Sequence, residues 1–163
     1  MPRIDLDRTD FAILEILQAD ARVSNQDLAE RVALSPSPCL RRVRRLEEAG
    51  VIRRYVALLD PVALGLGLLA YVNVKLEKRK QDEEGRFAFD SFRDDVQRWP
   101  EVVACYAMTG DIDYLMRVQA RDLDDFSRFV LEKLLKHPAV LDVRSGFALD
   151  RIKETTALPL RLS

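Results

Sequence analysis

The sequence contains little of the chemistry that most enzymes and metal centres need. It has one histidine, His137, and two cysteines, Cys39 and Cys105, which lie far apart and form no Cys-x-x-Cys pair. So few histidines and cysteines, at these positions, argue against a zinc site and a disulfide framework. No glycine-rich phosphate loop and no Gly-x-Ser-x-Gly motif occurs, and His137 precedes Pro138 where a helix end favours a cationic cap. We therefore expect no catalytic residue, no metal and no cofactor.

The chain also lacks an excess of charge of either sign. Lys and Arg number 26 against 27 Asp and Glu, so any attraction to nucleic acid must come from a local cluster. No apolar run reaches about 18 residues, the length that crosses a bilayer, and the start does not resemble a signal peptide. We expect a cytoplasmic protein with no membrane contact. With 163 residues, 48% of them hydrophobic, it can bury one core or two small ones.

Three helix starts are predicted within the first fifty residues. Each has a polar acceptor at the N-cap, an apolar residue before it and another four positions into the helix. The three N-cap residues are Asp7, Ser24 and Ser35. Pro36 and Pro38 follow the third N-cap and fall in the first turn, whose N–H groups have no helical partner, so they mark a start and not a break. Gly50 is placed to end this third helix.

The third predicted helix has an apolar side and a basic side. At about 100° per residue, one side carries Cys39, Leu40, Val43 and Leu46. The opposite side carries Ser37, Pro38, Arg41, Arg42, Arg44 and Arg45. A solvated helix face ordinarily mixes both signs of charge, whereas here Glu47 and Glu48 come only in the last turn, where the helix dipole disfavours them. The pattern predicts a helix-turn-helix that binds the DNA major groove, with a merely solvated face as the alternative.

The remaining two thirds of the chain predict a βαββαβ order. Residues 68–76 alternate between apolar and polar, as a strand does, and two later segments repeat apolar residues at helical spacing. The predicted elements after the first strand are a helix through Phe89, Phe92, Val96 and Trp99, a strand at 102–108, a turn at 109–111, a strand at 112–120, a helix from Leu123 to Leu134 and a strand at 140–149. This order predicts an antiparallel, ferredoxin-like sheet with both helices on one face.

The predicted fold class is α+β, with a winged-helix-like helix-turn-helix domain and a ferredoxin-like domain. We place the boundaries at 1–50 for the DNA-binding domain, 51–67 for a linker with a strand, 68–150 for the βαββαβ domain and 151–163 for a terminal strand or tail. The mixed-charge run 77–86 reads as a surface loop. Because one chain supplies no second layer for the open face of the sheet, we expect a homo-oligomer, a dimer at least.

Four stretches resemble the Lrp/AsnC transcription regulators: 24-SNQDLAERVALSPSPCLRRVRRLEEAGVI-52, 55-YVALLDP-61, 109-TGDIDYL-115 and 143-VRS-145. The resemblance covers nearly the whole chain. It implies a bacterial, amino-acid-responsive regulator with a DNA-binding domain and an amino-acid-binding domain that dimerises. It further implies that dimers assemble into rings, commonly octamers.

The resemblance also implies roles for particular positions. The positions that match the DNA-contacting helix are Pro36, Ser37, Pro38, Arg41, Arg42 and Arg45, to which the basic side adds Arg44. Those that match the effector region, placed by the family between dimers, are Ala107, Met108, Thr109, Gly110, Asp111, Asp113 and Tyr114. Further response positions are Leu123, Phe147 and Ala148. Under this interpretation Asp113 or nearby backbone groups hold the charged ends of the amino acid, although aspartates in a tight turn also occur for backbone reasons.

Two questions stay open at this point. The family pattern has an aromatic residue before its apolar strand pair, where this chain has Gly146 and then Phe147. The effector is therefore leucine or another apolar amino acid, and a larger apolar or aromatic one is a hypothesis. The regulator is either global or local to a neighbouring gene. A non-DNA-binding amino-acid-sensing oligomer is the remaining alternative, whereas an enzyme would need a catalytic domain for which no residues remain.

Overall fold

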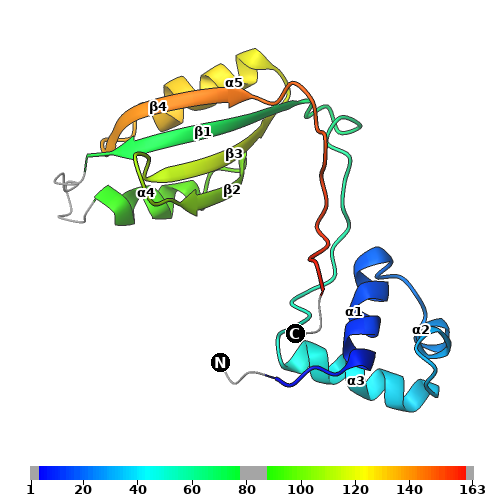
Figure 1. Cartoon of the computed structure of the whole chain (residues 1–163). Helices are drawn as coiled ribbons and strands as arrows, with labels where there is room; N and C mark the ends of the chain where they lie inside the picture. Colours follow the sequence, from blue (N-terminus) through cyan, green and yellow to red (C-terminus); the bar gives the residue numbers. More distant parts are fainter. Residues whose placement is uncertain (1–3, 78–87, 161–163) are drawn as a thin grey trace. The chain divides into compact units, whose positions relative to one another are not determined.

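The computed structural model describes residues 4–77 and 88–160 (Figure 1). It divides into two compact units, one formed by the residues up to Leu58 together with those from Lys153 onward, and one formed by Leu59–Ile152. Most of the predicted surface loop, residues 78–86, lies outside the described residues. Among the helices that the structure describes, none combines the length and the hydrophobicity that a membrane span needs.

The first unit contains the three predicted helices: α1 (Arg8–Ala19), α2 (Asn25–Arg31) and α3 (Pro36–Glu48). A capping box begins α1, because the Asp10 N–H donates to Asp7 at 2.9 Å and the Asp7 N–H donates to Asp10 at 3.1 Å. The Ser24 hydroxyl accepts from the Asp27 N–H at 3.1 Å and caps α2. The prediction of a side-chain cap at Ser35 is wrong, since its side chain makes no cap hydrogen bond and α3 begins on its two prolines.

The turn between α2 and α3 closes on a left-handed residue. Ala33 has a φ of 54°, and the Leu34 N–H donates to the Ala29 carbonyl at 2.9 Å. Gly50, with a φ of 72°, ends α3 in the same way, because the Val51 N–H donates to the Leu46 carbonyl at 2.9 Å. The helices pack around one small core, whose buried members are Ile13, Leu14, Leu28, Ala29, Cys39 and Leu46.

The second unit has the predicted βαββαβ order. Its elements are β1 (Leu68–Leu76), α4 (Ala88–Val96), β2 (Val102–Ala107), β3 (Tyr114–Ala120), α5 (Leu123–Phe129), the π-helical turn η1 (Val130–Leu134) and β4 (Val140–Phe147). The strands lie in the order β2-β3-β1-β4 and every neighbouring pair is antiparallel. The ferredoxin-like prediction is therefore confirmed, although the second helix changes from α to π geometry at Val130.

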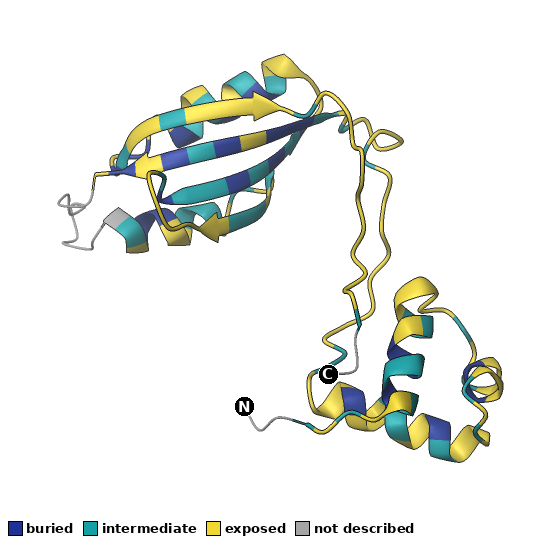
Figure 2. Ribbon diagram, in the orientation of Figure 1, coloured by how far each residue is buried: buried dark blue, intermediate teal, exposed yellow. Residues whose placement is uncertain are grey.

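One face of the sheet carries both helices and the core. Val72 and Val74 of β1 and Met116 of β3 are buried beneath Phe92 of α4 and Phe126 of α5. From Ala70 to Leu76 of β1 the buried positions alternate with exposed or half-buried ones (Figure 2), because successive side chains point to opposite faces. The second face, which includes Tyr71 and Tyr106, is not covered by any described element of this unit.

Two smaller predictions are corrected. Residues 51–67 contain no strand in the described structure. The prediction for His137 omitted its packing: the ring is buried against those of Phe92 and Trp99, its Nδ1 accepts from the Ala139 N–H at 3.1 Å, and its Nε2 lies 3.6 Å from Asp95 Oδ2. His137 is therefore a core residue.

Candidate DNA-binding surface and effector sites

Helix α3 is built so that one side packs and the other meets solvent. Cys39 and Leu46 are buried in the core of the first unit, while Pro36, Ser37 and Arg41 are exposed. The Asn25 side chain donates to the Pro36 carbonyl at 2.9 Å, which holds the first turn of α2 against that of α3. The N-terminal turn of α3 is thus fixed within its domain, as a recognition helix must be.

Two of the four arginines of α3 turn back to α1. Arg42 Nη1 lies 2.7 Å from Asp7 Oδ2 and 2.9 Å from Asp10 Oδ1, and Arg45 Nη2 pairs with Asp10 Oδ2. The side chain of Asp10 is 0% exposed, so its charge has no compensation except these guanidinium groups and the capping box. The Asp10 N–H, and secondly Arg42, hold the pKa of Asp7 below its ordinary value.

The other two arginines of α3 remain in solvent. Arg41 and Arg44 are exposed, and no carboxylate among residues 4–77 and 88–160 pairs with either. The basic side predicted from the sequence therefore contains two kinds of arginine. Arg42 and Arg45 are bound to carboxylates of the same domain, whereas within the described residues Arg41 and Arg44 are not. Unpaired guanidinium groups on the exposed side of a helix suit phosphate and base contacts.

The predicted effector residues of the β2–β3 turn lie together at one end of the sheet. The exposed ones are Ala107, Met108, Thr109, Gly110 and Asp111. Asp113 is buried instead, and its Oδ2 accepts from the Leu76 N–H at 2.8 Å. That carboxylate oxygen ties the turn to β1, and a role in holding the charged ends of a ligand would have to compete with this bond.

The predicted response positions lie at the other end of the sheet. Phe147 packs on Phe126 with ring centroids 5.1 Å apart, Leu123 is exposed at the start of α5, and the Ala148 N–H donates to the Leu69 carbonyl. The Asp113 N–H donates to the Val74 carbonyl. Val74 and Leu69 are five residues apart on β1, which is about 17 Å at roughly 3.3 Å per residue. One chain therefore does not bring the two groups into one site.

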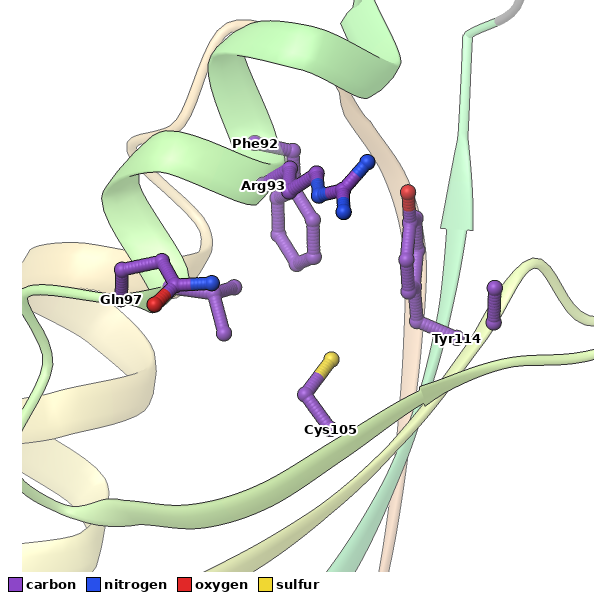
Figure 3. Close-up of a pocket in the computed structure, with 7 residues that line it drawn as sticks. Phe92, Arg93, Gln97, Cys105 and Tyr114 are labelled. Atoms are coloured by element: carbon purple, nitrogen blue, oxygen red, sulfur yellow. The ribbon is translucent and has the colours of Figure 1, made fainter. Parts of the chain in front are cut away.

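A cavity of about 340 Å³ opens between α4 and the strands β2 and β3 (Figure 3). We call it the α4 cavity. Its lining residues are Phe92, Arg93, Val96, Gln97, Cys105, Ala107 and Tyr114. The sequence interpretation had assigned only Ala107 and Tyr114 to ligand binding. Arg93 of α4 and Gln97, which directly follows α4, also line the cavity, and the sequence interpretation had assigned neither of them a role.

Two family models match successive parts of the chain. A model described as the Lrp/AsnC ligand binding domain matches residues 69–158, and one described as winged helix-turn-helix DNA-binding matches residues 6–53. The leucine-responsive regulatory proteins of Klebsiella pneumoniae and of Escherichia coli K12 are each 39% identical over 160 residues, which cover 98% of this chain and 94% of theirs.

Two solved structures are similar along nearly the whole chain. A transcriptional regulator from Neisseria meningitidis in complex with L-Met has a TM-score of 0.89 and 48% identity, covering 95% of this chain and 97% of that one. An AsnC family transcriptional regulator from Agrobacterium tumefaciens has a TM-score of 0.85 and 42% identity, covering 94% and 97%.

The helix-turn-helix unit and the ferredoxin-like unit together define a DNA-binding regulator with a separate ligand domain. The chain belongs to the Lrp/AsnC family of transcription regulators. It is accordingly a DNA-binding transcriptional regulator with an amino-acid-binding domain. Members of this family are transcriptional regulators and not enzymes.

Proposed function

We propose that this regulator binds DNA through the exposed side of α3 and responds to an apolar amino acid of the methionine or leucine class. The DNA-binding part of this proposal rests on one observation: in the described structure, Arg41 and Arg44 are exposed and have no carboxylate partner. These two side chains, with Ser37 and Pro36 in the first turn, contact phosphates and base edges. Arg42, Arg45 and Pro38 support the helix and lie at the margin of the contact.

The effector half is supported by the β2–β3 turn and by a similar protein. The exposed turn residues Ala107, Met108, Thr109, Gly110 and Asp111, flanked by Tyr114, form the part of the site that one chain supplies. Leu123, Phe147 and Ala148 lie at the opposite end of β1, so they meet an effector only when a second subunit brings them to it. Similarity to the Neisseria regulator crystallised with L-Met supports an apolar effector.

Assembly is the proposed link between the two halves. The uncovered sheet face packs against the same face of a second copy, and the dimer presents two α3 helices to half-sites about 34 Å apart. Dimers associate further, with an octamer as the proposed form, and the effector shifts that association. Because the same protein carries both sites, an effector that alters assembly also alters DNA affinity.

Binding to DNA from the region upstream of its own gene, measured in a salt series, tests the proposal. If Arg41 and Arg44 of two subunits each neutralise one phosphate, log affinity falls with log salt at a slope of about −4. Arg44→Ala removes one contact per subunit, so the slope becomes shallower by about 2. Arg98→Ala is the matched control, since Arg98 is exposed in the other unit and pairs with Asp95.

Two outcomes would contradict the proposal. An Arg44→Ala protein with unchanged affinity and slope would remove α3 from the interface. A wild-type protein whose DNA binding responds to none of the twenty amino acids would remove the effector half and leave only a DNA-binding oligomer.

A further inference from the structure

We propose that the first unit binds residues 158–160 of its own chain as an extended peptide, and that this segment acts as a strap. The strap is a second covalent connection between the DNA-binding unit and the ligand domain, and it limits the orientations that the DNA-binding unit adopts. Limited orientations favour contact with two DNA half-sites at once. This role rests on the proposed function, which supplies the two half-sites, whereas docking of the segment does not depend on it.

Gln18 of α1 recognises the backbone of one residue of this segment. Its amide nitrogen donates to the Leu158 carbonyl at 3.2 Å, and its amide oxygen accepts from the Leu158 N–H at 2.6 Å. Two antiparallel strands pair in the same way, because a hydrogen-bonded pair of residues exchanges both bonds. The side-chain amide therefore takes the place of a neighbouring strand, and it suits a segment with an extended backbone.

An apolar groove beside Gln18 receives the last leucine of the segment. Leu160 is half-buried and packs against the core of the first unit. One wall of the groove includes Leu17 of α1, and the other includes Val51 and Ile52 from the chain after α3. Small domains bury little apolar surface, so an additional packed leucine contributes to the stability of this unit.

The sequence of the segment favours an extended backbone before docking. Pro159 lies between Leu158 and Leu160, and the residue before a proline is restricted to extended conformations. Proline also has no N–H, so the segment leaves no donor unpaired between its two contact residues. Residues 151–160 form no helix and no strand in the described structure. Docking therefore depends on Gln18 and the apolar groove and not on a sheet.

The chain passes between the two units twice. It leaves the first unit after Leu58 and returns to it at Lys153 (Figure 1). Without docking, the only covalent connection would be the linker of residues 51–67, which contains no helix or strand in the described structure. When one oligomer binds two half-sites, the second contact is intramolecular, and its effective concentration depends on how freely each unit moves. Docking therefore raises the affinity for paired half-sites and leaves the contact of one unit with one half-site unchanged.

Hydrogen exchange of the Leu158 amide in the full-length protein measures docking. Gln18→Ala removes both hydrogen bonds, so exchange becomes faster by about two- to tenfold. Leu160→Asp places a charge against the apolar groove, so exchange becomes faster by about tenfold or more. Gln26→Ala and Leu149→Asp are the matched controls, because Gln26 is exposed on α2 and Leu149 is fully exposed. Each control changes the rate by less than about twofold.

A cross-link identifies the chain that supplies the segment. Gln18→Cys combined with Leu158→Cys is treated with a short bis-maleimide and analysed on a denaturing gel. Gln18→Cys alone is the control for links to Cys39 or Cys105. We expect the cross-linked product at the mass of one chain. A product at the mass of two chains would show that the segment exchanges between copies, and would overturn docking within one chain.

Affinity for DNA with one or two half-sites distinguishes a strap from an ordinary part of the domain core. Footprinting on the upstream DNA defines the protected region, which is then used whole or cut to one half-site. Release of the segment in Leu160→Asp lowers the affinity for the whole region by about tenfold or more, and the affinity for one half-site by less than about twofold. A unit that had simply unfolded would lose both affinities equally.

Three results would overturn the inference. If Leu158 amide exchange is the same in the wild type, Gln18→Ala and Leu160→Asp, the segment is not docked and the proposed function stands. If Leu160→Asp releases the segment and both DNA affinities change equally or not at all, docking does not restrict the unit. If the wild-type protein binds no DNA, the role of the strap fails together with the DNA-binding half of the proposed function, and hydrogen exchange still decides whether the segment docks.

Discussion

Asp10 determines which arginines of α3 face α1 and which face solvent. Its buried carboxylate receives Arg42 and Arg45, and it also accepts the Asp7 N–H that closes the capping box. A buried charge without such partners would cost several kcal/mol, and removal of one partner from a buried pair typically costs about 3–5 kcal/mol. One aspartate thus joins the start of α1 to the middle of α3, and Arg41 and Arg44 remain the two arginines of α3 without a carboxylate partner among the described residues.

Asp7 gives this junction a pH dependence. Its pKa is lowered from the ordinary value of 3.8, first by the Asp10 N–H and then by Arg42. A carboxyl with a depressed pKa in the folded state contributes stability above its ordinary pKa and loses it as pH falls through the folded value. Asp7→Asn keeps an N-cap acceptor and removes the charge. We therefore expect the variant to be less stable than the wild type at pH 7, and the difference to shrink below about pH 4.

Urea unfolding followed by far-UV circular dichroism at pH 7, 5, 4 and 3 measures this difference. Asp5→Asn is the matched control, because Asp5 is exposed and makes no ion pair within the described residues. A difference between Asp7→Asn and the wild type that is the same at pH 7 and pH 3 would show that charge at Asp7 is not the cause.

The helix starts differ in what stabilises them, and two serines expose the difference. Ser24 accepts the Asp27 N–H at 3.1 Å, whereas Ser35 makes no side-chain cap bond and precedes two prolines. Ser24→Ala should therefore lower the free energy of unfolding by about 1 kcal/mol, and Ser35→Ala by well under about 0.5 kcal/mol. Both serines are exposed and lie in the same unit, so urea titration of the two variants is a matched comparison. Equal losses would contradict the assignment.

Local elements were the predictable part of this fold. The N-caps at Asp7 and Ser24 and the alternation of β1 are decided by residues a few positions apart, and they were confirmed. The pairing of Asp10 with Arg42 joins residues 32 positions apart and depends on where α3 meets α1, which no local pattern encodes. The α4 cavity likewise depends on how α4 sits over β2 and β3.

The change from α to π geometry at Val130 escaped prediction for a different reason. Leu123, Phe126, Val130 and Leu134 follow one another at spacings of three, four and four residues, and a spacing of four is compatible with both an α and a π turn. Hydrophobic spacing therefore located the second helix and could not determine its hydrogen bonding.

At the scale of the whole molecule, the uncovered face of the sheet is the feature that one chain leaves incomplete. Strand register places Tyr106, Leu115, Asn73 and Arg144 in one row across this face. Exposed aromatic side chains over a sheet are typical of a face that another layer covers. In the dimer proposed above, a second copy would supply that layer with two-fold symmetry, so each residue near the axis would meet its own counterpart.

Tyr106→Lys tests this interface, because it places a charge on the sheet face of each subunit. We expect the mass in solution, measured by light scattering after size exclusion, to fall toward that of the monomer, since desolvating two added charges costs more than the contact supplies. Leu131→Lys is the matched control: Leu131 is 59% exposed, as Tyr106 is, but it lies on η1, away from the open face. A Tyr106→Lys protein that keeps the wild-type mass would place the dimer contact elsewhere, whereas loss of dimer in both variants would show that the mass does not report on the sheet face.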